Sequence, residues 1–373
     1  MVYSILWPDG RPFDGSLDGA TKVNFGKTKE VFKRPDGYFA ISHKDILTAF
    51  DNPEFTGHAP GKWTASAYST ALLYKRLEEK WVKTAHRGIL NAHTTIEEGL
   101  DMLPFEIIWR RYNVEGNSWE KRHPSQVEVG ARYDTIKYEV CLKWSVKDAE
   151  DKMIDDPFLL LDENFQPMLR NDGMPRLMHP KEANKEIEYT SVIHPNKWWE
   201  IVFDEVRAAM EQFSQYAGEI RQMAEKVQEI TFDTYAQIGR LNADGKIEVW
   251  LNEKKELVLG DELELDALRN MSSKKIRIND KEYEYEKDLL GKNLNEVITE
   301  WAVSVSCIVL AEHSGKQRYR DQVKVWKDTP MSDLRQEAND AAALNVTNMV
   351  YVPVAQTLSN RFGTEVWYFF QIS

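Results

Sequence analysis

The sequence predicts an α+β fold built from antiparallel sheets and a few helices. Helical and strand-forming patterns are mixed along the chain without the strict strand–helix–strand order of a doubly wound parallel sheet. Hairpin signals join neighbouring strand patterns, and the clearest is the turn Pro35-Asp36-Gly37 within the β-prone stretch 23–41. The 373 residues are enough for two packed units or one large two-lobed unit.

Three segments have the apolar periodicity of helices. The first covers 63–81, with Tyr68, Leu72, Leu77 and Trp81 on one stripe. The clearest covers 198–229, where apolar residues recur at spacings of four and three. A third covers 292–311. We interpret the stripe of 198–229 as core packing.

The remaining regular segments read as strands and hairpins. Residues 51–62 and 162–197, both rich in turn-forming residues, are predicted to be loops, the second a long loop or insertion. A meander is expected from a strand at 232–241 through the turn Asn242-Ala243-Asp244-Gly245. Strands are predicted at 82–89, 104–112, 132–146, 246–251 and 256–264, with a hairpin at 274–286 and a last strand at 364–373.

Composition excludes several functional classes. Sixty acidic residues against 48 basic ones give a net charge of -12, so nucleic acid and anionic membranes are poor partners. The longest apolar run, around 303–311, is too short to span a bilayer, and the start has no signal-peptide pattern. Cys141 and Cys307 form no metal-binding or disulfide pattern, which fits a reducing cytoplasm. We expect small-molecule substrates and leave the oligomeric state open.

The first candidate for chemistry is the run Gly26 to Phe32. Strand alternation would place Lys27 and Lys29 on the same face, opposite Thr28. Two ammonium groups on one face repel each other unless an anion such as polyphosphate, or carboxylates, lie between them. The alternative interpretation is two solvated lysines on a strand.

The second candidate is the strand around Glu106 and Arg110, followed by a Gly-Asn-Ser turn ending at Ser118. Glu106 and Arg110 are four residues apart, so an extended strand places them on one face. Arginine suits bidentate phosphate recognition, and the turn offers further donors. The alternative is an internal salt bridge.

The third candidate is the acidic stretch 259–269. Carboxylates such as that of Asp261, at the end of a strand, are the hard oxygen ligands that Mg²⁺ accepts. Arg269 could bind a second phosphate. The alternative is an exposed acidic strand, which is common in so acidic a chain.

Taken in order, these motifs resemble the phosphoribosylaminoimidazole-succinocarboxamide synthase (SAICAR synthetase) family. The resemblance extends over about 23–325. It rests on Gly26 to Phe32, Lys44 to Ala49, Gly61-Lys62, Asp101 to Pro104, Glu106, Arg110, Gly116, Ser118, Lys121-Arg122, Glu139, Lys143, Asp156-Pro157, Leu259, Asp261, Glu262, Asp266, Arg269 and Tyr319-Arg320-Asp321.

The resemblance implies a two-lobed, ATP-grasp-like fold with a cleft between the lobes. Residues 1–102 would form the ATP-binding lobe and 103–325 the substrate and metal lobe, with insertions at 162–197 and 270–312 and a C-terminal extension at 326–373. The implied reaction joins L-aspartate to a carboxylated aminoimidazole ribonucleotide, with ATP cleaved through an acyl phosphate to ADP and phosphate.

The resemblance also implies roles for individual residues. The residues that would bind the nucleotide are Lys27, Lys29, Asp101, Met102 and Glu106. Lys27 would also be catalytic. Asp261 would hold Mg²⁺, with Glu106 nearby. Arg110, Ser118 and Arg269 would bind the ribonucleotide phosphate. Lys143 and Asp156 are catalytic candidates on the amino-acid side.

One family motif, Asp-x-Lys-x-Glu-Phe-Gly, is aligned here with 233–239, on the strand predicted before the meander. Tyr235 then replaces the lysine, and Gln237 replaces the metal-side glutamate. A glutamine carbonyl can still coordinate Mg²⁺ but brings no charge. These changes leave two alternatives open: a nucleotide-binding pseudoenzyme, and a related ligase with a changed nucleotide or amino-acid substrate.

Overall fold

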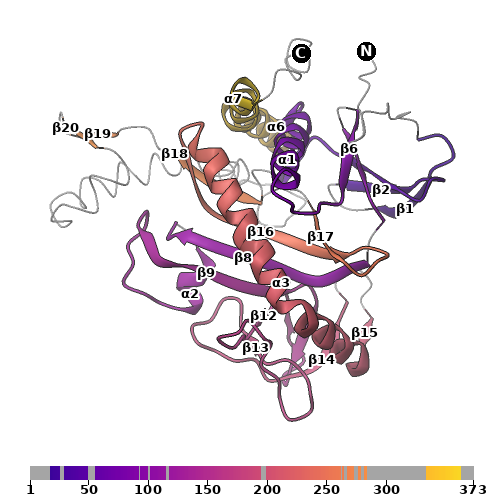
Figure 1. The fold of residues 1–373 in the computed structure, drawn as a ribbon. Coiled ribbons are helices and arrows are strands. Elements are labelled where there is room, and N and C mark those ends of the chain that lie inside the picture. Colours follow the sequence, from indigo (N-terminus) through magenta and orange to yellow (C-terminus); the bar gives the residue numbers. More distant parts are fainter. Residues whose placement is uncertain are drawn as a thin grey trace. The chain divides into compact units, whose positions relative to one another are not determined.

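The structure is a computed structural model. It describes residues 17–25, 29–48, 55–91, 93–99, 101–114, 117–194, 199–261, 263, 267–272, 276–278, 281–283 and 333–362. The chain forms two compact units: unit 1 is Met1–Gly99, Ile230–Asn242 and Glu262–Ser373, and unit 2 is Leu100–Glu229 and Ala243–Asp261. Residues grouped by sequence into one lobe from 103 to 325 are therefore divided between the two units. The α+β class with antiparallel sheets is confirmed (Figure 1).

Unit 1 contains an antiparallel sheet of five strands in the order β1-β2-β3-β7-β6. The strands are β1 (Thr21–Phe25), β2 (Lys29–Lys33), β3 (Phe39–His43), β7 (Thr94–Glu97) and β6 (His86–Asn91). The predicted turn joins β2 and β3, and Gly37 has the positive φ of 90° that glycine tolerates best. The N-terminal hairpin is confirmed.

The predicted first helix is α1 (Lys62–Glu78), which follows the short pair β4 (Ile46–Thr48) and β5 (Thr56–His58). Its stripe ends sooner than expected, because Trp81 lies beyond the helix and is 90% exposed. The C-terminal part of unit 1 is α6 (Asp333–Val346), a π-helical turn η2 (Thr347–Tyr351) and α7 (Val352–Phe362). A β-carbon at Gly57 would come within 2.2 Å of the backbone oxygen of Asn339, so β5 packs directly against α6.

Unit 2 is built on antiparallel strands in the order β13-β12-β9-β8-β16-β17. Their bounds are β13 (Leu177–Met178), β12 (Phe158–Leu159), β9 (Arg132–Leu142), β8 (Asp101–Tyr112), β16 (Arg240–Leu251) and β17 (Leu257–Gly260). One register row runs Cys141–Glu106–Glu248–Gly260 across the four strands from β9 to β17. Residues two apart from this row share its face.

The two faces of this sheet differ in character. Phe105, Ile107 and Trp109 are fully buried on one face, and the long helix α3 (Phe203–Ala236) covers it (Figure 1). The rings of Phe105 and Phe213 of α3 are 4.9 Å apart in an edge-to-face contact. The predicted helical stripe is thus core packing, as expected, and the other face carries the charged residues Glu106, Arg110, Asp244, Lys246 and Glu248.

A second sheet of unit 2 has the order β11-β10-β14-β15. It contains β11 (Met153–Ile154), β10 (Ser145–Asp148), β14 (Tyr189–Ile193) and β15 (Glu200–Ile201). The segment predicted as a long loop, 162–197, therefore contributes β13 and β14 to two sheets. A short helix, α2 (Ser118–Arg122), begins after Asn117, whose side chain accepts the Trp119 backbone N–H as an N-cap.

The structure overturns one predicted stretch. The expected strand 232–241 and the turn Asn242 to Gly245 are wrong: α3 continues to Ala236, and β16 runs through the supposed turn. Asn242 is fully buried and its amide donates to the Arg269 carbonyl, so tertiary contacts override the turn preference.

Three further strands lie in the C-terminal half of the chain, between residues 268 and 283. β18 (Leu268–Ser272) pairs with β16, and β19 (Ile276–Ile278) pairs with β20 (Lys281–Tyr283), which confirms the second hairpin. The predicted helix 292–311, the last strand 364–373 and Tyr319-Arg320-Asp321 lie outside the described residues. Among the helices that are described, none is long and apolar enough to cross a membrane.

Candidate active site

The candidate site lies on the polar face of the unit 2 sheet. Strand alternation places Glu106 and Arg110 of β8 on this face, as predicted, and aligns Asp244, Lys246 and Glu248 of β16 beside them. Two groups of charged side chains result. We call Glu106, Asp156, Asp261, Glu248, Lys143 and Lys246 the carboxylate–lysine cluster, and Arg110, Arg122, Ser118, Glu139 and Asp244 the arginine cluster.

In the carboxylate–lysine cluster, lysines bridge adjacent acids. Lys246 donates to Glu106 at 2.6 Å, Lys143 donates to Glu248, and Lys143 also lies 3.9 Å from Glu106. Among the residues that the structure describes, the cluster contains four carboxylates and two ammonium groups, and its own charges sum to an excess of negative charge. Within the part of the chain that the structure describes, no group of three or more acidic, His or Cys side chains is arranged to hold a metal ion by itself.

The excess charge appears in the pKa values. Burial and the neighbouring Asp261 raise the pKa of Glu248, against the opposing effect of Lys143. Desolvation and the Glu106 carboxylate raise the pKa of Asp156. Burial opposes the charged forms of Lys143 and Lys246, but the surrounding carboxylates outweigh it and raise the pKa of both amines. A cation, or a proton on a carboxylate, would relieve this repulsion.

Two acids of this cluster have strained backbones. Asp156 and Asp261 have φ values of 51° and 58°, in the left-handed region that residues other than glycine seldom adopt. Such conformations recur at ligand sites, where the surrounding structure enforces them. Asp156 follows β11 and Asp261 follows Gly260, the last residue of β17, so the ends of both strands present a carboxylate to the cluster.

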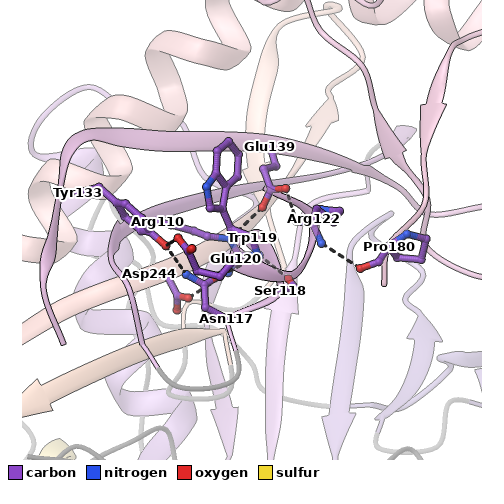
Figure 2. Close-up of polar contacts among 10 residues, drawn as sticks. All are labelled: Arg110, Asn117, Ser118, Trp119, Glu120, Arg122, Tyr133, Glu139, Pro180 and Asp244. Carbon is purple, nitrogen blue, oxygen red and sulfur yellow. Dashed lines mark hydrogen bonds and ion pairs between the residues drawn. The ribbon is translucent and has the colours of Figure 1, made fainter. Parts of the chain in front are cut away.

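The residues of the arginine cluster are joined by ion pairs and a hydrogen bond (Figure 2). Arg110 donates through Nε to Glu139 at 2.8 Å, through Nη1 to Asp244 at 3.2 Å and through Nη2 to Ser118 Oγ at 2.9 Å. Burial disfavours the charge on Arg110, yet Glu139 and Asp244 raise its pKa. Arg122 donates to the other oxygen of Glu139. The side chain of Arg110 is therefore fixed in one orientation.

These contacts answer part of the question left by the sequence. The structure brings Arg110 and Ser118 together, as the phosphate-binding hypothesis requires. It also shows that Arg110 forms internal salt bridges, with Glu139 and Asp244 instead of Glu106. Arg269, the third predicted phosphate ligand, is half-buried on β18 in unit 1.

Unit 1 contains the predicted nucleotide-side lysines. Lys29 on β2 is the register partner of His43, and Lys62 opens α1, buried, with its Nζ 5.3 Å from the Tyr351 ring centre. Burial, followed by the charges of Lys29 and Lys62, lowers the pKa of His43 well below its usual value. Lys27 lies outside the described residues.

The predicted adenine segment is the start of β8 in unit 2. Met102 is 53% exposed, and its backbone pairs in register with Trp250 of β16. On the other side of β8, pairing with β9 begins at Phe105, so Met102 has no register partner in β9. The side chain of Asp101 is not described.

Comparison with known proteins gives the family. The sequence model of SAICAR synthetase matches residues 22–166 and 199–307, which is more than half of the chain. The chain belongs to the SAICAR synthetase family. It is 28% identical over 266 residues to the phosphoribosylaminoimidazole-succinocarboxamide synthase of Sulfurisphaera tokodaii, covering 70% of this chain and 88% of that protein.

Other members are similarly distant. The synthase of Thermococcus sibiricus is 28% identical over 248 residues, covering 65% of this chain and 81% of that protein. A structure of the Saccharomyces cerevisiae SAICAR synthase complexed with SAICAR is 15% identical, with a TM-score of 0.49 over 92% of this chain and 97% of that one. The family match leaves out 167–198, so most of the predicted insertion is outside it.

Within this family, the structure changes how one motif is read. The alignment at 233–239 required a strand, but Tyr235 is a buried residue of α3 and Gln237 is an exposed residue in the turn after that helix. The same Asp-x-Lys-x-Glu pattern occurs intact at Asp244, Lys246 and Glu248, on a strand that pairs with β17 next to Asp261. Sequence analysis missed these three residues although the spacing was visible, because Asn242 to Gly245 resembled a turn.

Proposed function

We propose that this protein is an ATP-dependent ligase that joins a carboxylated aminoimidazole ribonucleotide to L-aspartate and forms SAICAR. Family membership supports the reaction class, and the carboxylate–lysine cluster is the observation that carries the proposal. A carboxylate reacts with an amine only after activation. In the acyl-phosphate route, a carboxylate oxygen attacks the γ-phosphorus of ATP and ADP leaves; the amine then attacks the carbonyl carbon and phosphate leaves.

The lysines of the cluster suit the first step. Lys246 and Lys143 are held between carboxylates, so their charges are fixed in position before substrate arrives. Pre-positioned ammonium groups stabilise the charge that develops on a transferring phosphoryl group. In unit 1, we assign Lys27 and Lys29 to the ATP phosphates, and in unit 2 the backbone at Asp101 and Met102 to the adenine.

Asp156 suits the second step. The amine of aspartate must lose a proton as the amide forms, and a general base works best when its pKa approaches the working pH. Desolvation and Glu106 shift the pKa of Asp156 in that direction. We therefore assign Asp156 as the proton acceptor, and Lys143, whose charge acts on Asp156, as the cation that orients the acidic substrate.

The residues present fit Mg²⁺. This ion is usually held by one or two protein carboxylates together with substrate phosphates, so a three-ligand protein cage is not required. Glu248 and Asp261 are two carboxylates whose mutual repulsion contributes to the raised pKa of Glu248. We assign Asp261 and Glu248 as its ligands in place of Gln237. When bound, Mg²⁺ neutralises phosphate charge and makes ADP a better leaving group.

The arginine cluster suits the ribonucleotide phosphate. Three of the five N–H groups of Arg110 are used by Glu139, Asp244 and Ser118, which orient its guanidinium. We assign Arg110, Ser118 and Arg269 to that phosphate. Tyr235 and Gln237 were the basis of the pseudoenzyme alternative, and the Asp-x-Lys-x-Glu pattern at 244–248 supports the ligase instead. A cytoplasmic location, expected from the cysteine pattern, is part of this proposal.

Incubation with the ribonucleotide, ATP, Mg²⁺ and a panel of amino acids tests the proposal. Mass spectrometry should detect a new amide with L-aspartate, formed together with ADP. An amide with a different amino acid would support the changed-substrate alternative. Binding of ATP without any amide would restore the pseudoenzyme.

A further inference from the structure

Arg122 is the most deeply buried charged residue of the arginine cluster, with no exposed surface. Its guanidinium carbon lies 3.6 Å from the centre of the Phe158 ring, and Nη2 pairs with Glu139. Burial lowers the pKa of Arg122, and Glu139 acts against that shift. Burying an arginine is costly unless the guanidinium is paired and hydrogen-bonded. Glu139 is the shared partner, since its other oxygen accepts from Arg110.

The inserted segment 167–198 holds Arg122 at two points. Nη1 of Arg122 donates to the Pro180 carbonyl at 3.2 Å (Figure 2), and the Asn184 backbone N–H donates to the Arg122 carbonyl at 2.9 Å. Both partners belong to the stretch that the family match leaves out. The segment is anchored to the rest of unit 2 because β14 pairs with β10, and a hydrogen bond from the Tyr189 hydroxyl to the Pro175 carbonyl ties the segment together internally.

We propose that Arg122 is a positioning residue for Arg110, and that the described part of the inserted segment, 167–194, is the brace that holds Arg122. The chain of contacts runs from Pro180 through Arg122 and Glu139 to Arg110. The inference rests on the proposed function, because it takes Arg110 to be the ligand of the ribonucleotide phosphate. The brace then sets the affinity for the ribonucleotide and leaves ATP binding unaffected.

The brace depends on the planar guanidinium group of Arg122. Its two terminal nitrogens donate separately to Glu139 and to the Pro180 carbonyl, while the plane of the group lies on the Phe158 ring. Lysine at position 122 keeps the charge but places one compact ammonium group, which cannot reproduce this arrangement. Glu139 then gains rotational freedom, and Arg110 loses its fixed orientation. A displacement of about 1 Å in a positioned group can cost roughly 100-fold in catalytic efficiency.

Arg122→Lys is the first test, and Phe158→Leu is a milder second variant in case the first does not fold. We expect the KM for the ribonucleotide to rise roughly 10- to 100-fold while the KM for ATP stays within about twofold. Calorimetric titration with the ribonucleotide and with ADP should show the same division. Arg176→Lys is the matched control, because Arg176 lies in the same segment and its side chain pairs, within the described part of the chain, with Glu186 at the surface.

Unchanged constants in both variants would overturn the inference. So would an equal rise in both KM values, which indicates a general loss of structure. The two proposals fail separately: a parent protein that binds the ribonucleotide but forms no amide refutes the ligase, and weaker ribonucleotide binding by Arg122→Lys would still support the brace. If the parent binds no ribonucleotide, the assignment of Arg110 and this inference are both overturned.

Discussion

Replacing Glu248 with glutamine removes one carboxylate charge and keeps the size of the side chain. In the structure this residue accepts a hydrogen bond from Lys143, lies opposite Glu106 in the strand register and repels Asp261. If Glu248 and Asp261 share Mg²⁺, the substitution weakens metal binding and leaves the fold intact. Hydrogen bonds and contacts of charged groups contribute about 1.5–3 kcal/mol each.

That free energy converts to roughly a 10- to 150-fold rise in the Mg²⁺ concentration for half-maximal ADP release, since about 1.4 kcal/mol corresponds to a factor of ten. The assay is a Mg²⁺ titration at saturating ATP, ribonucleotide and aspartate. Gln237→Glu is the matched control: it adds a carboxylate at the position first aligned with the metal ligand, which is exposed in the turn after α3. We expect it to change nothing.

The reasoning is refuted if Gln237→Glu lowers the Mg²⁺ requirement while Glu248→Gln leaves it as in the parent. That result would return the family motif to 233–239. A lower Tm for Glu248→Gln without any change in the Mg²⁺ titration would show that Glu248 only balances the charge of Lys143.

Three further predictions concern the other parts of the site. Arg110→Lys should raise the KM for the ribonucleotide at least about tenfold, because it loses the bidentate fork, with little effect on ATP; impaired ATP binding alone would contradict the assignment. Lys29→Ala should weaken ATP binding by about 1.5–3 kcal/mol in calorimetry, with unchanged unfolding; unchanged ATP binding would favour a solvated strand lysine. Asp156→Asn should lower kcat roughly 100- to 10,000-fold, and a kcat near that of the parent would exclude it as the base. Because the pKa of Asp156 is raised in the folded state, its cost to stability appears as pH rises through that pKa. The variant should therefore have the higher Tm at neutral pH, and the difference should vanish in acid.

The sequence predicted correctly those elements that depend on neighbouring residues. The hairpin around Gly37 follows from the residue types of its turn, and helix α3 follows from apolar residues that recur with the helical period of about 3.6 and form one buried face. The same reasoning failed at Asn242 to Gly245, where turn-forming residues lie inside β16. There the deciding contacts join distant parts of the chain: Asp244 pairs with Arg110, 134 positions earlier.

The sequence also predicted only part of the candidate site. Alternation placed Glu106 and Arg110 on one face of β8, but not their partners, because strand order and register decide which side chains meet. Lys246 reaches Glu106 only because β16 lies beside β8 in one specific register. A shift by one residue would point Lys246 and Glu248 at the opposite face, under α3.

The fate of one oxygen atom tests the proposed reaction most directly. The ribonucleotide is prepared with ¹⁸O in its carboxylate and incubated with ATP, Mg²⁺ and L-aspartate, and the phosphate released is examined by mass spectrometry. Activation through an acyl phosphate predicts that each phosphate formed with the amide carries one oxygen from the substrate carboxylate. Phosphate that carries no label, released while the amide forms, would contradict the acyl-phosphate route and the roles assigned to the carboxylate–lysine cluster.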